Sequence, residues 1–484
     1  MVGVTRSAEI LLPDPSRVVA IPFIPGSSTF GGASTRVDVI AERILSLSED
    51  ATATLLAETR HRFEGRHRDL EAVWEAGYLQ AAAHSERMND VSPERRLLLG
   101  ACFVQEYSYE AAALCNPSIV ATVAEPEADG SLPFVMSLRA IGEGHISSVE
   151  FRSGTVHAGG RVEIDAPTPY SVAGRRRSPV YEKKTFVAKL DELGADPIIA
   201  RKVFENIAEN FELTDLEWEI ADFERTEISS AAAFETMHLI HWLASSNYVL
   251  SFDDGPISER VMAPAGPADS RGMEDARFVR FVDDDGSVTY YATYTAWDGH
   301  TVLPQMIETR DFLRFRIATL NGSALHNKGM AMFPRRIDGL YYALSRHDQE
   351  SIFVMRSDHA RFWHATELVY APTEPWESIQ LGNCGSPIET TEGWLVLTHG
   401  VGAMRTYGIG ALLLDLDDPT RIIGGLAEPL LSPAADERDG YVPNVVYSCG
   451  GLIHDGHLVL PYGVADRAVR IATVNLEELI GAME

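Results

Sequence analysis

The chain has 484 residues, of which 45% are hydrophobic and 23% charged, an ordinary composition for a globular protein with a large core. Its 41 basic and 70 acidic residues give a net charge of −29, which repels phosphate backbones and anionic lipid, so we expect neither nucleic-acid nor membrane partners. The N-terminus lacks a signal-peptide pattern, no stretch approaches the ~20 apolar residues of a membrane span, and the four cysteines form no CxxC pair. These features predict a cytoplasmic protein with reduced thiols.

Helical spacing dominates the chain from about residue 36 to residue 115. Ser92 is a good helix N-cap because Pro93 and Glu94 follow it, and apolar residues then recur at helical spacing. This pattern predicts a helix over 94–114, within an N-terminal helical segment that spans residues 1–115.

From residue 116 the hydrophobic period changes to that of strands. A turn followed by an apolar strand with a polar end recurs five times, at 132–140, 288–296, 339–347, 393–401 and 457–465. The last four copies are spaced by roughly 50 to 65 residues, the scale of a propeller blade. We predict a mainly β fold, a five-bladed β-propeller over 116–484, with a helical insertion at about 166–245. The alternative is a β-sandwich of the same short strands.

Polar residues close each of these repeats. They are Arg139, Thr293 with Thr295, Arg346 with His347, His399, and Tyr462 with Asp466. Charged groups at strand ends are costly to bury unless they are solvated or paired, so their recurrence predicts one shared polar pocket at the propeller axis. The alternative is that each charge caps its own blade.

The segment GMEDAR (272–277) places Glu274 beside Asp275, with Arg271 and Arg277 flanking the pair. Adjacent carboxylates on an extended strand point to opposite faces, so one is expected in the pocket and the other on a flanking arginine. A carboxylic acid among apolar or anionic neighbours has a raised pKa and can donate a proton.

Ten motifs in order resemble those of glycoside hydrolase family 130, which contains mannoside phosphorylases and mannosidases on a five-bladed propeller. They are NPS (116–118), LRA (138–140), GMEDAR, YTAWDG (294–299), HNKGMAMFP (326–334), YYALSRH (341–347), GWLVLTHG (393–400), LLDLDDP (413–419), ERDGYVPNVVYSCG (437–450) and YGVAD (462–466). The resemblance implies that Asp275 is the general acid. It also implies a sugar site lined by Asn116, Arg139, Tyr462 and Asp466.

Two departures from the family pattern bear on the nucleophile. Ala276 replaces the motif's proline, and Gln380 stands nineteen residues before His399, where the family's phosphorylases carry a lysine. Glutamine keeps hydrogen bonding but lacks the positive charge that helps to bind phosphate.

The favoured hypothesis is phosphorolysis of β-mannosidic bonds in manno-oligosaccharides, with inorganic phosphate as co-substrate and mannose 1-phosphate as product. It needs no cofactor, and the phosphate ligands would be Arg346, His347, His399 and Lys328. Hydrolysis by water is the alternative, and it requires a carboxylate base, for which Glu143 and Glu437 are the candidates.

Two other hypotheses carry less support. A sugar-binding propeller without catalysis would have no use for an acid among cations. A metal site built from His145, His300, His347 and His399 lacks ligand spacing on any one element. The helical additions, with their apolar faces, predict packing on the propeller and a homo-oligomer.

Overall fold

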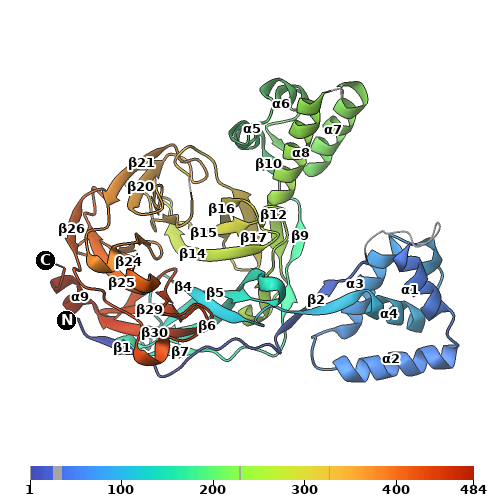
Figure 1. Ribbon diagram of the computed structural model, residues 1–484, viewed down its shortest axis with the longest axis horizontal. Coiled ribbons are helices and arrows are strands. Elements are labelled where there is room, and N and C mark those ends of the chain that lie inside the picture. Colours follow the sequence, from blue (N-terminus) through green and yellow to red (C-terminus); the bar gives the residue numbers. More distant parts are fainter. Residues whose placement is uncertain (1, 26–34, 228–229, 326, 484) are drawn as a thin grey trace.

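The computed structural model describes residues 2–25, 35–227, 230–325 and 327–483. Its strands form several sheets around a common centre, and its longer helices gather in two separate groups (Figure 1). The fold is therefore mainly β. Within the described ranges no helix is both long enough and apolar enough to span a membrane.

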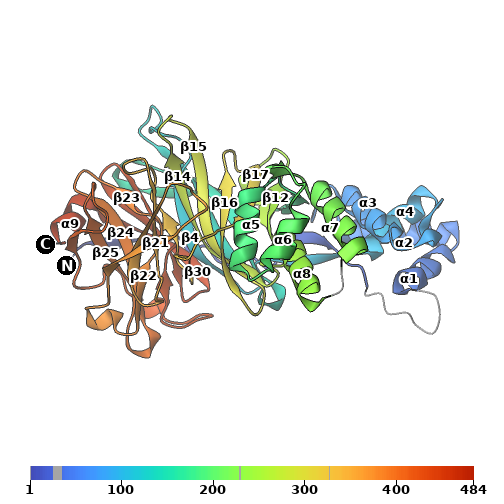
Figure 2. The ribbon, with the colours of Figure 1, turned by 90° about the horizontal axis from the view of Figure 1, so that it is seen from above.

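The first group of helices lies at one end of the molecule (Figure 2). It contains α1 (Arg36–Leu45), α2 (Glu49–Phe63), α3 (Leu70–Ala82) and α4 (Pro93–Cys102). The prediction of a helix up to residue 114 is wrong beyond Cys102, because β3 (Val104–Ser108) pairs there with β2 (Val18–Pro22). Pairing with a distant strand overrides the local helical spacing.

Each of the five predicted repeats is a strand. The strands are β5 (Leu132–Ile141), β15 (Val288–Trp297), β19 (Tyr341–Ser345), β24 (Trp394–Val401) and β29 (His457–Val464). Each is the second strand of an antiparallel run. The first strands are β4 (Ala113–Ala121), β14 (Gly272–Val282), β18 (Ala331–Met332), β22 (Gln380–Asn383) and β27 (Val446–Tyr447).

The remaining strands complete the runs on their outer side, except for Ile388–Glu389 and Leu452–His454, which pair with the same edge of the second strand as the first strand does. They are β6 (Ser147–Val156) and β7 (Val162–Ile164) in run one; β16 (Val302–Thr309) and β17 (Arg314–Thr319) in run two; β20 (Ile352–Ser357) and β21 (Ala365–Tyr370) in run three; β23 (Ile388–Glu389), β25 (Tyr407–Leu414) and β26 (Ile422–Gly425) in run four; and β28 (Leu452–His454), β30 (Ala468–Asn475) and β1 (Val4–Arg6) in run five. Because β1 pairs with β30, the start and the end of the chain share one sheet. The short helix α9 (Leu476–Gly481) follows β30.

The hydrophobic core lies between neighbouring runs. Separate apolar clusters join runs one and two, two and three, three and four, four and five, and five and one. A cavity of about 450 Å³ is lined by residues in or next to the first strands of all five runs, from Val120 to Leu452. In the described ranges no sheet closes on itself, and runs one and two share one larger sheet through the Gly272–Ser147 pair. Strand β13 (Arg260–Met262) pairs with β6 of run one.

The second group of helices is inserted between runs one and two. In chain order it contains β8 (Val172–Ala173), β9 (Arg175–Arg177), β10 (Tyr181–Glu182), α5 (Lys183–Glu192), α6 (Pro197–Val203), β11 (Asn210–Phe211), α7 (Leu213–Glu227), α8 (Ala231–Ser246) and β12 (Tyr248–Ser251). Strand β12 pairs with β17, so the insertion extends the outer edge of run two.

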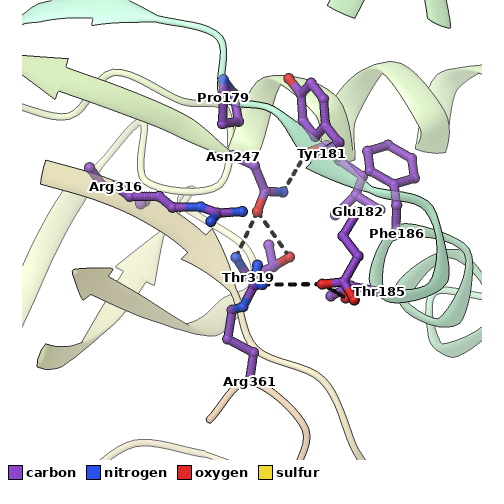
Figure 3. Close-up of a pocket in the computed structure, with 11 residues that line it drawn as sticks. Pro179, Tyr181, Glu182, Thr185, Phe186, Asn247, Arg316, Thr319 and Arg361 are labelled. Carbon is purple, nitrogen blue, oxygen red and sulfur yellow. Dashed lines mark hydrogen bonds and ion pairs between the residues drawn. The ribbon is translucent and has the colours of Figure 1, made fainter. Parts of the chain in front are cut away.

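Polar contacts fix the junction between the insertion and the sheets (Figure 3). The Asn247 Oδ1 accepts from the backbone N–H of Thr319 at 2.9 Å, and Arg361 Nη2 donates to Glu182 Oε2 at 3.2 Å. The insertion is therefore held to both run two and run three.

Candidate functional site

A β-bulge in β14 shapes the site. The register between β14 and β15 shifts between Glu274 and Arg277, and Asp275 has a φ of 55°, which is unusual for a residue with a side chain. Arg139 consequently reaches both carboxylates, with Nη2 2.8 Å from Glu274 Oε1 and Nη1 3.3 Å from Asp275 Oδ1. The two carboxylates therefore do not point apart as expected, because the bulge turns Asp275. The expected contact with a flanking arginine is present, with Arg277 Nη2 3.9 Å from Asp275 Oδ2.

A matching bulge in β4 brings Asn116 to the same place. Its φ is 49°, and the register between β4 and β5 shifts between Cys115 and Ser118. Asn116 Nδ2 donates to Asp275 Oδ1 at 2.5 Å, and Lys328 Nζ donates to Glu274 Oε2 at 3.0 Å. We call Asn116, Arg139, Glu274, Asp275 and Lys328 the Asp275 cluster.

The charge state of Asp275 differs from the expectation of a raised pKa. Burial alone would raise its pKa, but the charges of Arg139, Arg277 and Lys328 and the Asn116 hydrogen bond outweigh burial and lower the pKa to about 2. The neighbours are cationic rather than apolar or anionic. In the ligand-free protein Asp275 is therefore ionised at neutral pH.

Arg277 lies beneath the bulge and is 1% exposed. Its Nη1 donates to the backbone oxygen of Asp275 at 2.9 Å, its Nε to that of Cys384 at 2.8 Å, and its Nη2 to the hydroxyl of Tyr447 at 2.8 Å. One guanidinium thus connects runs two, four and five. It also holds the backbone of Asp275 in its left-handed conformation.

A second group of polar side chains lies next to this arginine, in a slot made by two glycines. Arg346 Nη1 is 3.3 Å from His399 Nε2. A Cβ at Gly382 would lie 2.3 Å from Arg346 Cδ, and a Cβ at Gly329 would lie 2.8 Å from Arg346 Nε. Both positions therefore need glycine for the Arg346 side chain to fit, and we call this group the Arg346 slot.

Charges in the Arg346 slot are not balanced. Burial, and then the charges of Arg346 and Arg277, lower the pKa of His399 well below 6.5, so this imidazole is neutral. Within the described ranges Arg346 has no carboxylate partner, and its Nε, buried, makes no hydrogen bond. The slot therefore holds a nearly buried cation without a counter-charge.

Asp466 lies beside the Asp275 cluster. Burial raises its pKa to about 6, the charge of Arg139 opposes this, and the charge of Asp275 adds to it. Like Asp275 and Asn116, it has a positive φ, 46°. The Tyr447 ring, whose centroid lies 4.8 Å from that of His399, connects this region to the Arg346 slot.

Two expected site residues lie in a different buried cluster. The Tyr462 hydroxyl donates to Glu437 Oε1 at 2.7 Å, and Arg470 Nη1 donates to the same oxygen at 2.8 Å. Arg6 Nε is 3.6 Å from Glu437 Oε2. Glu437 and Tyr462 are both 0% exposed, so these contacts tie β1 and run five together.

Glu143 and His347 also lie apart from Asp275. Glu143 is exposed on a turn, where its backbone oxygen accepts from the Tyr107 hydroxyl at 3.2 Å. His347 Nδ1 is 3.2 Å from the backbone oxygen of Ala324, and its ring packs against Phe353.

Sequence analysis did not find the roles of Arg277, Tyr447 and the two slot glycines. Arg277 was visible only as a neighbour of the carboxylate pair. The glycines lie in QLGNCG and NKGMAM, but nothing in those motifs states which side chain passes over them.

Comparison with known proteins was decisive for the family. A family model described as β-1,4-mannooligosaccharide phosphorylase matches residues 253–484. A 1,2-β-oligomannan phosphorylase of Thermoanaerobacter sp. (strain X514) is 32% identical over 235 residues, which cover 46% of this chain and 75% of that protein. This chain belongs to glycoside hydrolase family 130.

Two further similar proteins come from Listeria innocua. A β-1,2-mannobiose phosphorylase of Listeria innocua is 34% identical over 221 residues, covering 44% of this chain and 60% of that protein. The solved structure of a β-1,2-mannobiose phosphorylase from Listeria innocua with β-1,2-mannobiose has 22% identity and a TM-score of 0.45, covering 77% of this chain and 92% of that one. The family match includes Asp275, Arg346, His399 and Asp466, whereas Arg139 lies before it.

Proposed function

We propose that this family 130 protein is an inverting phosphorylase that transfers a β-linked mannosyl group from a manno-oligosaccharide to inorganic phosphate. The two relatives described above are phosphorylases of β-1,2-linked mannosides, and a third, from Ruminococcus albus, is a β-1,4-mannooligosaccharide phosphorylase. The observation that carries the proposal is the buried Arg346 cation, which has no carboxylate partner in the described ranges.

The Arg346 slot suits an anion for energetic reasons. Removing a charge from water costs several kcal/mol unless an opposite charge compensates it. A phosphate oxyanion in the slot would supply that charge and accept hydrogen bonds from Arg346. A water nucleophile would gain little from an arginine there.

Asp275 is proposed as the proton donor. Because its pKa is low in the ligand-free protein, it must gain its proton after the substrates bind. Phosphate entering beside it adds negative charge, which raises the pKa of Asp275 and favours its protonation in the loaded site. Attack of a phosphate oxygen on the anomeric carbon then breaks the bond to the glycosidic oxygen. That oxygen takes the proton from Asp275, through a sugar hydroxyl as in the family, and the products are mannose 1-phosphate and the shortened sugar.

The sugar is proposed to lie on Asn116, Arg139 and Asp466. These three groups offer an amide, a guanidinium and a carboxylate within contact range or electrostatic reach of Asp275. Lys328 and His347 remain proposed anion ligands, although Lys328 is engaged by Glu274. For Tyr462, the hydrogen bond to buried Glu437 supports a role beneath the site.

Hydrolysis is the second candidate because Gln380 adds no positive charge to the slot. It needs a carboxylate base on the far side of the sugar. Glu437 is fully buried and held by Arg470 and Arg6, and Glu143 is exposed on a turn.

We also propose that residues 116–484 form a five-bladed propeller, with the helical segment 1–115 and the insertion at about 166–245 as additions. Five runs of strands, five apolar clusters between consecutive runs and a cavity lined from all five runs support it. A crystal structure with the runs stacked as two layers would contradict it.

A cytoplasmic homo-oligomer is the proposed state of the protein. The described free thiols and the value of keeping bond energy as a sugar phosphate support the location. Exposed Ile198, Trp218 and Phe234 on the helical insertion support self-association. A monomer mass in light scattering at micromolar concentration would contradict it.

Turnover of β-1,2- and β-1,4-mannobiose should be measured against phosphate concentration. We expect a saturable dependence with mannose 1-phosphate as the product. A rate that is independent of phosphate, with free mannose as the product, would contradict phosphorolysis and support hydrolysis.

A further inference from the structure

One aromatic pair bridges the first and the last runs of strands at the edge of the site. The Tyr441 hydroxyl lies 2.7 Å from His145 Nδ1, and the ring centroids are 5.9 Å apart. The two residues are 296 positions apart in the sequence. Tyr441 is 45% exposed and His145 is exposed as well, so this contact is not part of a core.

Both partners are anchored within a few residues of proposed sugar-binding groups. The backbone N–H of Val442 donates to the oxygen of Ala465 at 2.9 Å, and Ala465 immediately precedes Asp466. His145 lies in the turn between β5 and β6, and that turn is followed by Ser147, whose hydroxyl accepts from Arg139 Nε at 2.8 Å. The pair therefore lies at the rim above Arg139 and Asp466.

The backbone holds this rim in a defined shape. His145 has a φ of 59°, and the turn is closed by a hydrogen bond from Gly142 N–H to the Ile146 oxygen at 3.0 Å. The Tyr107 hydroxyl donates toward the backbone oxygens of Glu143 and Ile146, at 3.2 and 3.3 Å. Tyr107 is in β3, so the N-terminal segment directly supports the turn that carries His145.

We propose that Tyr441 and His145 form the binding surface for the acceptor sugar, the hexopyranose ring that leaves when the bond is broken. This inference rests on the proposed function and identifies where its second sugar binds. The ring that reacts must lie deepest, at Asp275, so the next ring extends toward the rim. An exposed tyrosine offers an apolar face to the C–H groups of a pyranose, and a fixed imidazole offers a hydrogen bond to a hydroxyl.

Tyr107 is a positioning residue in this scheme. It has no direct contact with the proposed sugar and acts through the turn. This gives the N-terminal segment a part in substrate selection, because loss of its support would displace His145 and, with it, the ring of Tyr441.

The test is synthesis from mannose 1-phosphate with mannose as acceptor, which separates the two sugar sites. Tyr441→Ala should raise the KM for the acceptor about tenfold and leave the KM for mannose 1-phosphate within about twofold. Tyr441→Phe keeps the ring and should show a smaller rise, similar to that of His145→Ala. Tyr107→Phe should raise the acceptor KM without changing the thermal midpoint. Trp218→Ala, an exposed aromatic on α7, is the matched control and should change neither constant.

An acceptor KM that is unchanged in Tyr441→Ala, or an equal rise in both KM values, would overturn the inference while the wild-type enzyme still turns over. Absence of wild-type product would instead count against the proposed function. In that case the acceptor surface can still be tested by calorimetry, because Tyr441→Ala should weaken the binding of β-1,2-mannobiose even without turnover. Equal affinity of both proteins, or no binding by either, would reject the acceptor surface.

Discussion

Two buried groups of charges in this protein look alike in composition and differ in use. The Glu150 cluster contains Arg17, Glu110, Glu150 and Arg152, with Arg17 Nε 2.7 Å from Glu110 Oε1 and Arg152 Nη1 3.0 Å from Glu150 Oε1. Its side chains are at most 4% exposed, whereas Arg139, Glu274 and Asp275 are 13–19% exposed. The first group is sealed from solvent, and the second is open to a ligand.

The backbone separates the two groups as well. Asn116 and Asp275, together with their neighbour Asp466, have positive φ angles, whereas no member of the Glu150 cluster is among the described residues with positive φ. Strained conformations persist only where the surroundings enforce them, and here Arg277 does so. Buried charge therefore does not by itself mark a site. Buried charge with residual exposure and a strained backbone does.

The largest effect is expected in the sealed group. Arg152→Ala leaves Glu110 and Glu150 with one cation between them and should lower the free energy of unfolding by about 3–5 kcal/mol. The kcat of the folded fraction should not change, because no member of the cluster reaches the sugar. Urea unfolding and steady-state kinetics check the two halves. A fall in kcat with unchanged stability would contradict a purely structural role for the Glu150 cluster.

Asp275→Asn should have the opposite signature. We expect a loss of kcat of at least about a hundredfold, the scale of general acid catalysis, with little change in the thermal midpoint. Removing the negative charge should also tighten phosphate binding, because the bound anion then no longer meets the repulsion of a nearby carboxylate. Glu110→Gln in the sealed cluster is the matched control. Near-normal turnover of an unactivated mannoside by the Asp275 variant would show that another group donates the proton.

Gln380→Lys extends the comparison by adding a positive charge next to the Arg346 slot. Gln380 lies two residues before Gly382 on β22, so its side chain leaves the strand on the face that meets Arg346 and His399. We expect phosphate to bind more tightly by about 1.5–3 kcal/mol, the range for a charged hydrogen bond. Gln105→Lys, at an exposed position of β3, adds the same charge elsewhere and should have no effect. A hydrolase would gain nothing from Gln380→Lys.

The sequence was most informative where the signal is local and repeated. The five second strands of the runs are apolar and each carries or is followed by polar groups, among them Arg139, Arg346 and His399, so their positions could be predicted. Their arrangement as consecutive, similar runs could also be predicted, because the spacing between them recurs.

Long-range geometry was not readable in the same way. Nothing near Val4 indicates that it pairs with Val474, at the other end of the chain, and nothing in Phe103-Val104 announces a strand partner at residues 18–22. The bulge at Asp275 depends on the clamp of Arg277 onto Cys384 and Tyr447, which only the fold brings together. The resemblance points to Asp275 as the general acid, and that role stays a prediction. Its expected raised pKa is wrong for the ligand-free protein, because the cations that the fold brings to it could not be read from the sequence.

The smallest expected effect concerns Asp466, whose raised pKa of about 6 makes it the carboxyl beside Asp275 that changes charge under mild conditions. Above pH 6 it is ionised and accepts strong hydrogen bonds from sugar hydroxyls, and below pH 6 it is protonated and accepts weaker ones. Mannobiose affinity should therefore rise about fivefold between pH 5 and pH 7, the difference between charged and neutral hydrogen bonds.

The stability of the fold should change with pH in the opposite direction. The folded state holds the Asp466 proton more tightly than the unfolded chain, so this contribution is complete below pH 3.8 and is lost as pH rises to about 6. Calorimetry without phosphate, where phosphorolysis cannot proceed, and urea unfolding across the same pH range measure both slopes. Asp466→Asn should flatten both, while Asp253→Asn on the surface should leave both intact. Affinity that is independent of pH in the wild-type protein would mean that the sugar does not contact Asp466. The proposed sugar site would then consist of Asn116 and Arg139 alone.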